Sequence, residues 1–140
     1  MATDKNPWAT VNLYTDGGTR GNPGRGAWAF LVTDKKGNEI HTDSGTLDGL
    51  VTNNESEYTA IIKGMKKCIE MGATRIRVFS DSELVVKQLN GQNRLKSDKL
   101  RKYHHALTSL RTPVTFNWLN RENPMIRQCD AMAARVLDGR

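Results

Sequence analysis

Four acidic residues stand where carboxylates could act together on a metal ion. Asp16 ends one predicted strand, and Asp81 comes at the end of another. If these strands are parallel neighbours, their backbones lie about 4.8 Å apart and both carboxylates emerge at the same rim of the sheet. Open α/β sheets place their ligands at this carboxyl rim. Glu57 and Asp130 are each expected in the first turn of a helix.

Carboxylates that converge in this way raise one another's pKa and resist ionisation. A divalent cation removes the conflict, and oxygen ligands suit Mg²⁺ or Mn²⁺. Two such ions about 4 Å apart can activate a water and stabilise the leaving oxygen when a phosphodiester is cleaved. The sequence has no His/Cys cluster typical of zinc sites and suggests no Ser-His-Asp or Cys-His arrangement. The acids therefore indicate metal-assisted phosphoryl chemistry.

Each acid also has an ordinary structural interpretation. Glu57 could be a helix-start acid within a box-like Asn54-x-x-Glu57 pattern, and Asp130 could complement a helix dipole. Asp16 could belong to a turn, and Asp81 could cap the helix that follows it. No single residue decides between the two interpretations, but the joint arrangement favours a site.

The hydrophobic pattern predicts the elements that hold these acids. Strands are expected over residues 10–16, 27–33, 39–47, 75–80 and 114–119, with turns over residues 17–26 and 35–38. Helices are expected from residue 54 to a glycine cap at Gly72, over residues 82–89, through residues 100–110, and over residues 129–137. Thr52-x-x-Glu55 is a good capping box for the first of these helices.

The element order βββ-α-β-α-α-β-α predicts an α/β layer fold. Three consecutive strands form an antiparallel meander, and a helical crossover returns a parallel strand to the sheet. At 140 residues, the chain is expected to be a single domain over residues 1–140.

Composition narrows the class of protein further. The chain is 37% hydrophobic with a mean hydropathy of −0.60, and it has neither a membrane-length apolar run nor an apolar signal core near its start. We therefore expect a cytoplasmic protein that does not engage a membrane. A net charge of +6 favours a polyanionic partner. Cys68 and Cys129 are interpreted as buried thiols, with a disulfide as the alternative that only geometry can settle.

Four segments of the chain closely resemble the four sequence blocks of the type 1 ribonuclease H family. In chain order they are TDGGTRGNPGRGAWAF, TNNESEYTAIIKGM, FSDSELVVKQLNG and WLNRENPMIRQCDAMA. The resemblance covers residues 12–137 and implies a ribonuclease H-like fold, a five-stranded mixed sheet with helices on both faces. It also implies that two Mg²⁺ ions, for which Mn²⁺ can substitute, are held by Asp16, Glu57, Asp81 and Asp130.

The same resemblance implies residues that bind the substrate. The family's loop beside the RNA strand is matched by Gly17, Gly18 and Asn22, its 2′-hydroxyl readers by Asn53 and Asn54, and its threonine at a DNA phosphate by Thr52. An Asn offers both a donor and an acceptor to a 2′-hydroxyl, although helix capping is the alternative role for Asn53 and Asn54. Gly17 and Gly18 would let the backbone approach the RNA strand without a clashing Cβ.

The chain departs from the family pattern in three places. Many members carry a histidine in the loop before the last Asp, but the loop here has none, and the candidates to replace it are Arg121, Glu122 and Asn123. The basic helical protrusion of many bacterial members has no room before Leu100, which makes this a short-loop form. Some of the lost phosphate contact could come from Lys87, Arg94, Lys96, Lys99, Arg101 and Lys102, whose alternative is a solvated helix face. Glu83 replaces a frequent glutamine and could only accept from a 2′-hydroxyl.

The resemblance implies an endonuclease that cuts the RNA strand of an RNA–DNA hybrid and leaves 5′-phosphate and 3′-hydroxyl ends. A monomer is expected. Two rival hypotheses remain at this point: another nuclease or DNA-joining enzyme on the same fold, and a non-catalytic module that binds nucleic acid.

Overall fold

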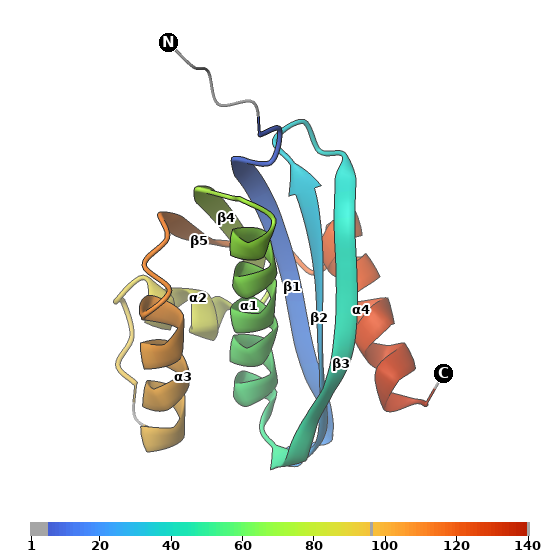
Figure 1. Ribbon diagram of the computed structural model, residues 1–140. Helices are drawn as coiled ribbons and strands as arrows, with labels where there is room; N and C mark the ends of the chain where they lie inside the picture. The colour runs from blue at the N-terminus through green and yellow to red at the C-terminus, as the bar shows by residue number, and fades with distance from the viewer. Residues whose placement is uncertain (1–5, 96, 140) are drawn as a thin grey trace.

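The computed structural model describes residues 6–95 and 97–139 (Figure 1). Its elements follow the predicted order: β1 (Thr10–Gly21), β2 (Gly24–Asp34), β3 (Glu39–Val51), α1 (Asn53–Glu70), β4 (Arg75–Ser80), α2 (Glu83–Leu89), α3 (Asp98–Thr108), β5 (Val114–Trp118) and α4 (Pro124–Leu137). Among these residues, no helix is both long and apolar enough to cross a membrane.

The five strands form one mixed sheet in the order β3-β2-β1-β4-β5. The pairs β1–β2 and β2–β3 are antiparallel, whereas β1–β4 and β4–β5 are parallel. Helix α1 packs on one face of β1 and β2, with α3 against it, and α4 packs on the opposite face of the same strands (Figure 1). The predicted meander, the crossover and the helices on both faces are confirmed.

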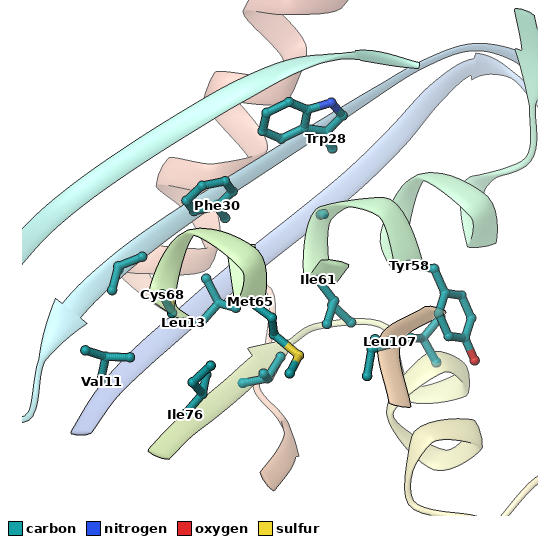
Figure 2. Packing of buried hydrophobic residues seen from close by; sticks show 14 of the residues in the cluster. Val11, Leu13, Trp28, Phe30, Tyr58, Ile61, Met65, Cys68, Ile76 and Leu107 are labelled. Atoms are coloured by element: carbon teal, nitrogen blue, oxygen red, sulfur yellow. The ribbon is translucent and has the colours of Figure 1, made fainter. Parts of the chain in front are cut away.

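The core is split by the sheet into two hydrophobic clusters because β1 and β2 alternate their side chains between the faces. Under α1, Leu13 of β1 packs with Ile61 and Met65 (Figure 2). Under α4, Leu31 packs with Ile126. The sheet is therefore covered on both faces at β1, the strand that carries Asp16.

Both cysteines are buried free thiols. Cys68 belongs to the cluster under α1, and Cys129 belongs to the cluster under α4. The prediction of buried thiols is confirmed, since the sheet separates the two residues and no disulfide joins them.

The predicted turn over residues 17–26 is wrong over most of its length. β1 continues to Gly21, and β2 begins at Gly24, with Gly21 paired opposite Gly24. Only the cis-linked Asn22-Pro23 step turns the chain. Glycines that usually mark turns are here paired strand residues, because the antiparallel ladder with β2 supplies their hydrogen bonds. Asp16 therefore lies within a strand and not at its end.

Helix α1 begins with the predicted capping box. The Thr52 hydroxyl accepts a hydrogen bond from the Glu55 backbone nitrogen at 3.2 Å, and the Thr52 nitrogen donates to the Glu55 carboxylate at 2.7 Å. The helix ends before Gly72, whose φ of +96° is the left-handed conformation expected at a glycine cap. Since Thr52 is the N-cap, Asn53 and Asn54 do not cap this helix.

Replacing Thr52 with alanine should therefore destabilise the fold by about 1 kcal/mol, the usual cost of losing an N-cap hydroxyl. The free energy of unfolding in urea would measure this cost. Thr52→Ser keeps the accepting hydroxyl and should stay within about 0.5 kcal/mol of the unmodified protein. Equal losses for both variants would contradict the capping role.

The last helix begins earlier than the sequence pattern predicts. Asn123 caps α4 by accepting from the nitrogens of Met125 and Ile126 at 3.0 and 3.3 Å, and Pro124 is its first residue. Asparagine followed by proline is a standard helix start. Asp130 is consequently the seventh residue of α4 and does not lie in its first turn, so a helix-dipole role no longer accounts for it.

Candidate active site

Three carboxylates from three elements meet at the junction of β1 and β4. Asp16 lies in β1, Glu57 in α1, and Asp81 directly after β4. The last β1–β4 pair is Thr15 with Ser80, and the residues that follow them are Asp16 and Asp81. One carboxylate oxygen from each acid lies within 4.8 Å of the other two. The predicted convergence of these three acids is confirmed.

Helix α1 reaches the cluster because β1 has a glycine beside Asp16. A Cβ built on Gly17 would lie 2.5 Å from the Glu57 nitrogen and closer still to the Ser56 carbonyl group. The Gly17 nitrogen donates a short hydrogen bond to the Glu57 carboxylate. Gly17 thus serves the contact between strand and helix, whereas Gly18, where an added Cβ meets nothing within 4 Å, has the open space expected beside a substrate.

The cluster resists full ionisation. Burial, together with the charges of Asp81 and Asp130, raises the pKa of Asp16 to about 8. Burial, followed by the charge of Asp16, raises the pKa of Glu57 well above its usual range. Burial also raises the pKa of Asp81, while the Arg121 guanidinium opposes this shift. A divalent cation would remove the cost of holding these groups as anions.

Asp130 lies at the edge of the cluster. It is exposed on α4 and does not belong to the group of three acids whose oxygens lie within 4.8 Å. It nevertheless lines the same hollow of about 440 Å³ as the other acids, and its charge raises the pKa of Asp16. The structure therefore assembles three of the four predicted ligands tightly and places the fourth beside them. We call this space the carboxylate hollow.

The predicted substrate residues surround the carboxylate hollow. Gly17, Gly18, Asn53 and Asn54 line it. An adjoining hollow of about 540 Å³ is lined by Asn22, Thr52 and both of these asparagines. Asn54 also lines a third hollow, of about 640 Å³, between α2 and α3. The three hollows share Asn54, and together we call them the groove beside the acids.

The hydrogen bonds of Asn53 set the direction in which its amide can bind. Its Oδ1 accepts from the Thr19 hydroxyl at 2.8 Å, and its backbone nitrogen donates to Asn22 Oδ1 at 3.1 Å. These two hydrogen bonds hold Asn53 against the end of β1 and the residue that follows it. Thr19 was not predicted from the sequence, because nothing along the chain links it to a residue 34 positions away.

Several other candidates lie further from the acids. Glu83 and Lys87 form an ion pair of 3.2 Å on α2 and do not line the carboxylate hollow. Lys99 lies 3.9 Å from the Glu55 carboxylate and lines the hollow that contains Thr52. Of the basic residues suggested as substitutes for a protrusion, Lys96 lies outside the described residues. Residues 90–97 contain no helix among those described, in agreement with the predicted short-loop form.

The three residues suggested to replace the missing loop histidine have different surroundings in the loop before α4. Arg121 lines the carboxylate hollow, Glu122 lines a neighbouring hollow, and the Asn123 side chain caps α4. Trp118, whose indole Nε1 donates to the Asp81 carbonyl at 3.2 Å, was not predicted from the sequence. An aromatic residue at the end of a predicted strand gives no sign that it contacts a site residue.

A mixed sheet with a buried acidic cluster between two parallel strands defines a class of α/β proteins with a site suited to divalent metal ions. Comparison with known proteins agrees with this class. The profile of the family described as "Reverse transcriptase-like" matches residues 14–135. Ribonuclease H from Campylobacter curvus is 32% identical, and the match covers 89% of this chain and 90% of that protein. The chain belongs to the ribonuclease H family, as its four sequence blocks predicted.

Solved structures agree with this assignment. The N-terminal RNase H domain of Rv2228c from Mycobacterium tuberculosis has a TM-score of 0.85 and 30% identity, with 94% of this chain and 95% of that chain covered. LC11-RNase H1, solved in complex with an RNA/DNA hybrid, has a TM-score of 0.85 and 29% identity, with 92% and 97% covered. The chain spans only 31% of the length of the bifunctional protein Rv2228c, to which it is 33% identical.

Proposed function

We propose that this protein is an endonuclease that hydrolyses the RNA strand of RNA–DNA hybrids with two divalent cations. Mg²⁺ is the proposed ion, with Mn²⁺ as a substitute, and the products carry 5′-phosphate and 3′-hydroxyl ends. The observation that carries the proposal is the convergence of Asp16, Glu57 and Asp81, whose oxygens lie within 4.8 Å of one another beside an asparagine-lined groove. The neighbour solved with a hybrid supports the same substrate class.

The residues present fit divalent cations. The donor set consists of carboxylate oxygens, which suit Mg²⁺ and Mn²⁺, and burial raises the pKa of both Asp16 and Glu57. Asp16, Glu57 and Asp81 would hold the ions, with Asp130 completing the set from α4. When bound, two divalent cations supply Lewis-acid stabilisation of the phosphate and a water activated for attack.

The groove supplies recognition of the substrate. The minor groove of a hybrid displays 2′-hydroxyl groups along one strand, and amide side chains can read them. Asn53, whose Oδ1 accepts from the Thr19 hydroxyl, would offer its amide nitrogen to this contact, and Asn54 lines all three hollows. Thr52 and Lys99, which line the second hollow, would bind a phosphate of the DNA strand. We further propose that the protein acts as a cytoplasmic monomer without contacting a membrane.

The direct test is cleavage of a labelled RNA–DNA hybrid with Mg²⁺ or Mn²⁺, beside duplex DNA and duplex RNA. We expect cleavage of the RNA strand in the hybrid and its complete loss with a chelator. Cleavage of duplex DNA instead would favour another nuclease of this fold. Thermal unfolding with and without Mn²⁺ distinguishes this enzyme from a non-catalytic binding module. An ion that binds only the folded state raises Tm, and a module without a metal site should show no increase. A folded protein that shows neither cleavage nor a Tm increase would contradict the proposal.

A further inference from the structure

Another hollow adjoins the carboxylate hollow at Asp81 and Arg121. It has a volume of about 440 Å³ and is lined by Asp81, Trp118, Asn120, Arg121 and Glu122. Asp81 and Arg121 line both spaces, so the two are neighbours around one site carboxylate. We call the space lined by Trp118 the Trp118 hollow. The substrate residues described above do not extend into it.

Trp118 gives this hollow a fixed apolar surface. It is the last residue of β5 and pairs with Ser80, the residue before Asp81. Its side chain is 50% exposed, which is unusual for so large an apolar group. The hydrogen bond from its Nε1 to the Asp81 carbonyl orients the ring beside the site. Such an aromatic surface at a nucleic-acid site can pack against a sugar or base.

Arg121 gives the hollow a cation. It is exposed, and no carboxylate among residues 6–95 and 97–139 forms an ion pair with it. Its charge lowers the pKa of Asp81 without forming an ion pair with it, and an exposed guanidinium is well suited to a phosphate. Glu122 borders the same hollow, so a bound anion would be held at the Arg121 side and not at the centre.

We propose that the Trp118 hollow is a subsite for one nucleotide of the RNA strand next to the cleaved linkage. Arg121 binds a phosphate that is not cleaved, and the Trp118 indole packs against the attached sugar. The inference rests on the proposed function, since it places the RNA strand at Asp81. It adds a contact in a hollow that Asn53 and Asn54 do not line.

The test measures binding without cleavage, in an Asp16→Asn background. Arg121→Gln should weaken binding of an RNA–DNA hybrid by about tenfold, the effect of losing one charged hydrogen bond to phosphate. Arg75→Gln is the matched control, because Arg75 is an exposed arginine at the other end of β4. Its loss should change affinity by about twofold or less at the same salt concentration.

A scan of the substrate locates the phosphate. One linkage at a time in the RNA strand is replaced by an uncharged 2′-deoxy methylphosphonate, and the 2′-deoxy phosphodiester at the same place is the reference. At one linkage near the cleavage position, neutralisation should weaken binding, and Arg121→Gln should then have no further effect. An Arg121→Gln penalty that is equal at every linkage would overturn the subsite.

Tryptophan fluorescence tests the second contact. The chain has three tryptophans, of which Trp28 is 8% exposed and Trp8 is 37% exposed. In a Trp8→Phe protein, hybrid should quench the emission of Trp118, and Trp118→Leu should weaken binding while Trp118→Phe retains most of it. Quenching that is absent at saturating hybrid would overturn the role of Trp118. If the Asp16→Asn protein bound no hybrid and the unmodified protein cut none, the proposed function itself would have failed.

Discussion

Replacing Asp16 with asparagine should abolish cleavage and, without divalent cations, make the folded protein more stable. Asp16 is 8% exposed, and its carboxylate lies with those of Glu57 and Asp81. A neutral amide keeps the shape of the side chain but removes a buried charge from among other acids. The same change removes an oxygen ligand that the ions need, so function and stability should move in opposite directions.

The sign of the pH dependence follows from the raised pKa of Asp16. In the folded state the pKa is about 8, against an ordinary value of 3.8. The folded state therefore holds its proton more tightly than the unfolded state does. The resulting stability is fully present below about pH 4 and is lost as the pH rises through about 8. Without metal, the free energy of unfolding of the unmodified protein should fall across this window, and Asp16→Asn should flatten the fall.

The expected gain at pH 8.5 is on the order of 2–4 kcal/mol, because neighbouring acids share the cost of ionisation. For a domain of this size, the gain corresponds to a Tm increase of roughly 5–15 °C. Adding Mn²⁺ should raise the Tm of the unmodified protein and leave that of the variant nearly unchanged. Urea unfolding from pH 4 to 9 in EDTA, repeated with Mn²⁺, measures both effects.

Cleavage by the Asp16→Asn variant should fall by about 10³-fold or more, since a Lewis acid supplies several kcal/mol to the transition state and each 1.4 kcal/mol is tenfold in rate. Asp48→Asn is the control, because Asp48 is an exposed acid of β3 that does not line the carboxylate hollow. It should retain activity and show the same pH dependence as the unmodified protein. An Asp16→Asn variant with normal cleavage would contradict the assignment of the metal site.

The order of the elements along the chain and the pair Asp16–Asp81 were predictable because they depend on local patterns. Alternating strands, a helical crossover and an acid after each of two parallel strands are readable along the chain. Those features alone place two carboxylates at one rim. The role of Glu57 needed the fold, since its local sequence was also typical of a helix-start acid. Its place among the other two carboxylates and its hydrogen bond from the Gly17 nitrogen distinguish it.

Other features depend on contacts between distant segments, which no local pattern encodes. The predicted β1 was too short because its glycine-rich second half was interpreted as a turn. Only the pairing of these glycines with β2 shows that they belong to the strand. The position of Asp130 was misjudged because the Asn123-Pro124 start of α4 lay within a segment interpreted as loop. Thr19 and Trp118 acquire their roles only through hydrogen bonds to Asn53 and Asp81.

Alanine substitutions at the neighbouring glycines Gly17 and Gly18 should have very different effects on stability, because the surroundings of the added methyl group differ. A Cβ at Gly17 would overlap the backbone of Ser56 and Glu57 in α1, whereas a Cβ at Gly18 meets nothing within 4 Å. Backbone atoms cannot rotate away as a side chain can, so Gly17→Ala must displace the start of α1. We expect a loss of about 3 kcal/mol in the free energy of unfolding, at the upper end of the cost of overpacking.

Gly18→Ala should leave stability within about 0.5 kcal/mol of the unmodified protein, as for a substitution in open space. Gly18 nevertheless lines the carboxylate hollow, so its new methyl group should obstruct the hybrid and raise KM for cleavage. Urea unfolding and steady-state cleavage on both variants provide the comparison. Gly17→Ala should lose stability together with kcat, because Glu57 moves with α1, while Gly18→Ala should lose substrate binding alone. Equal stability of the two variants would contradict the close approach of α1 to β1, and it is this approach that brings Glu57 to Asp16.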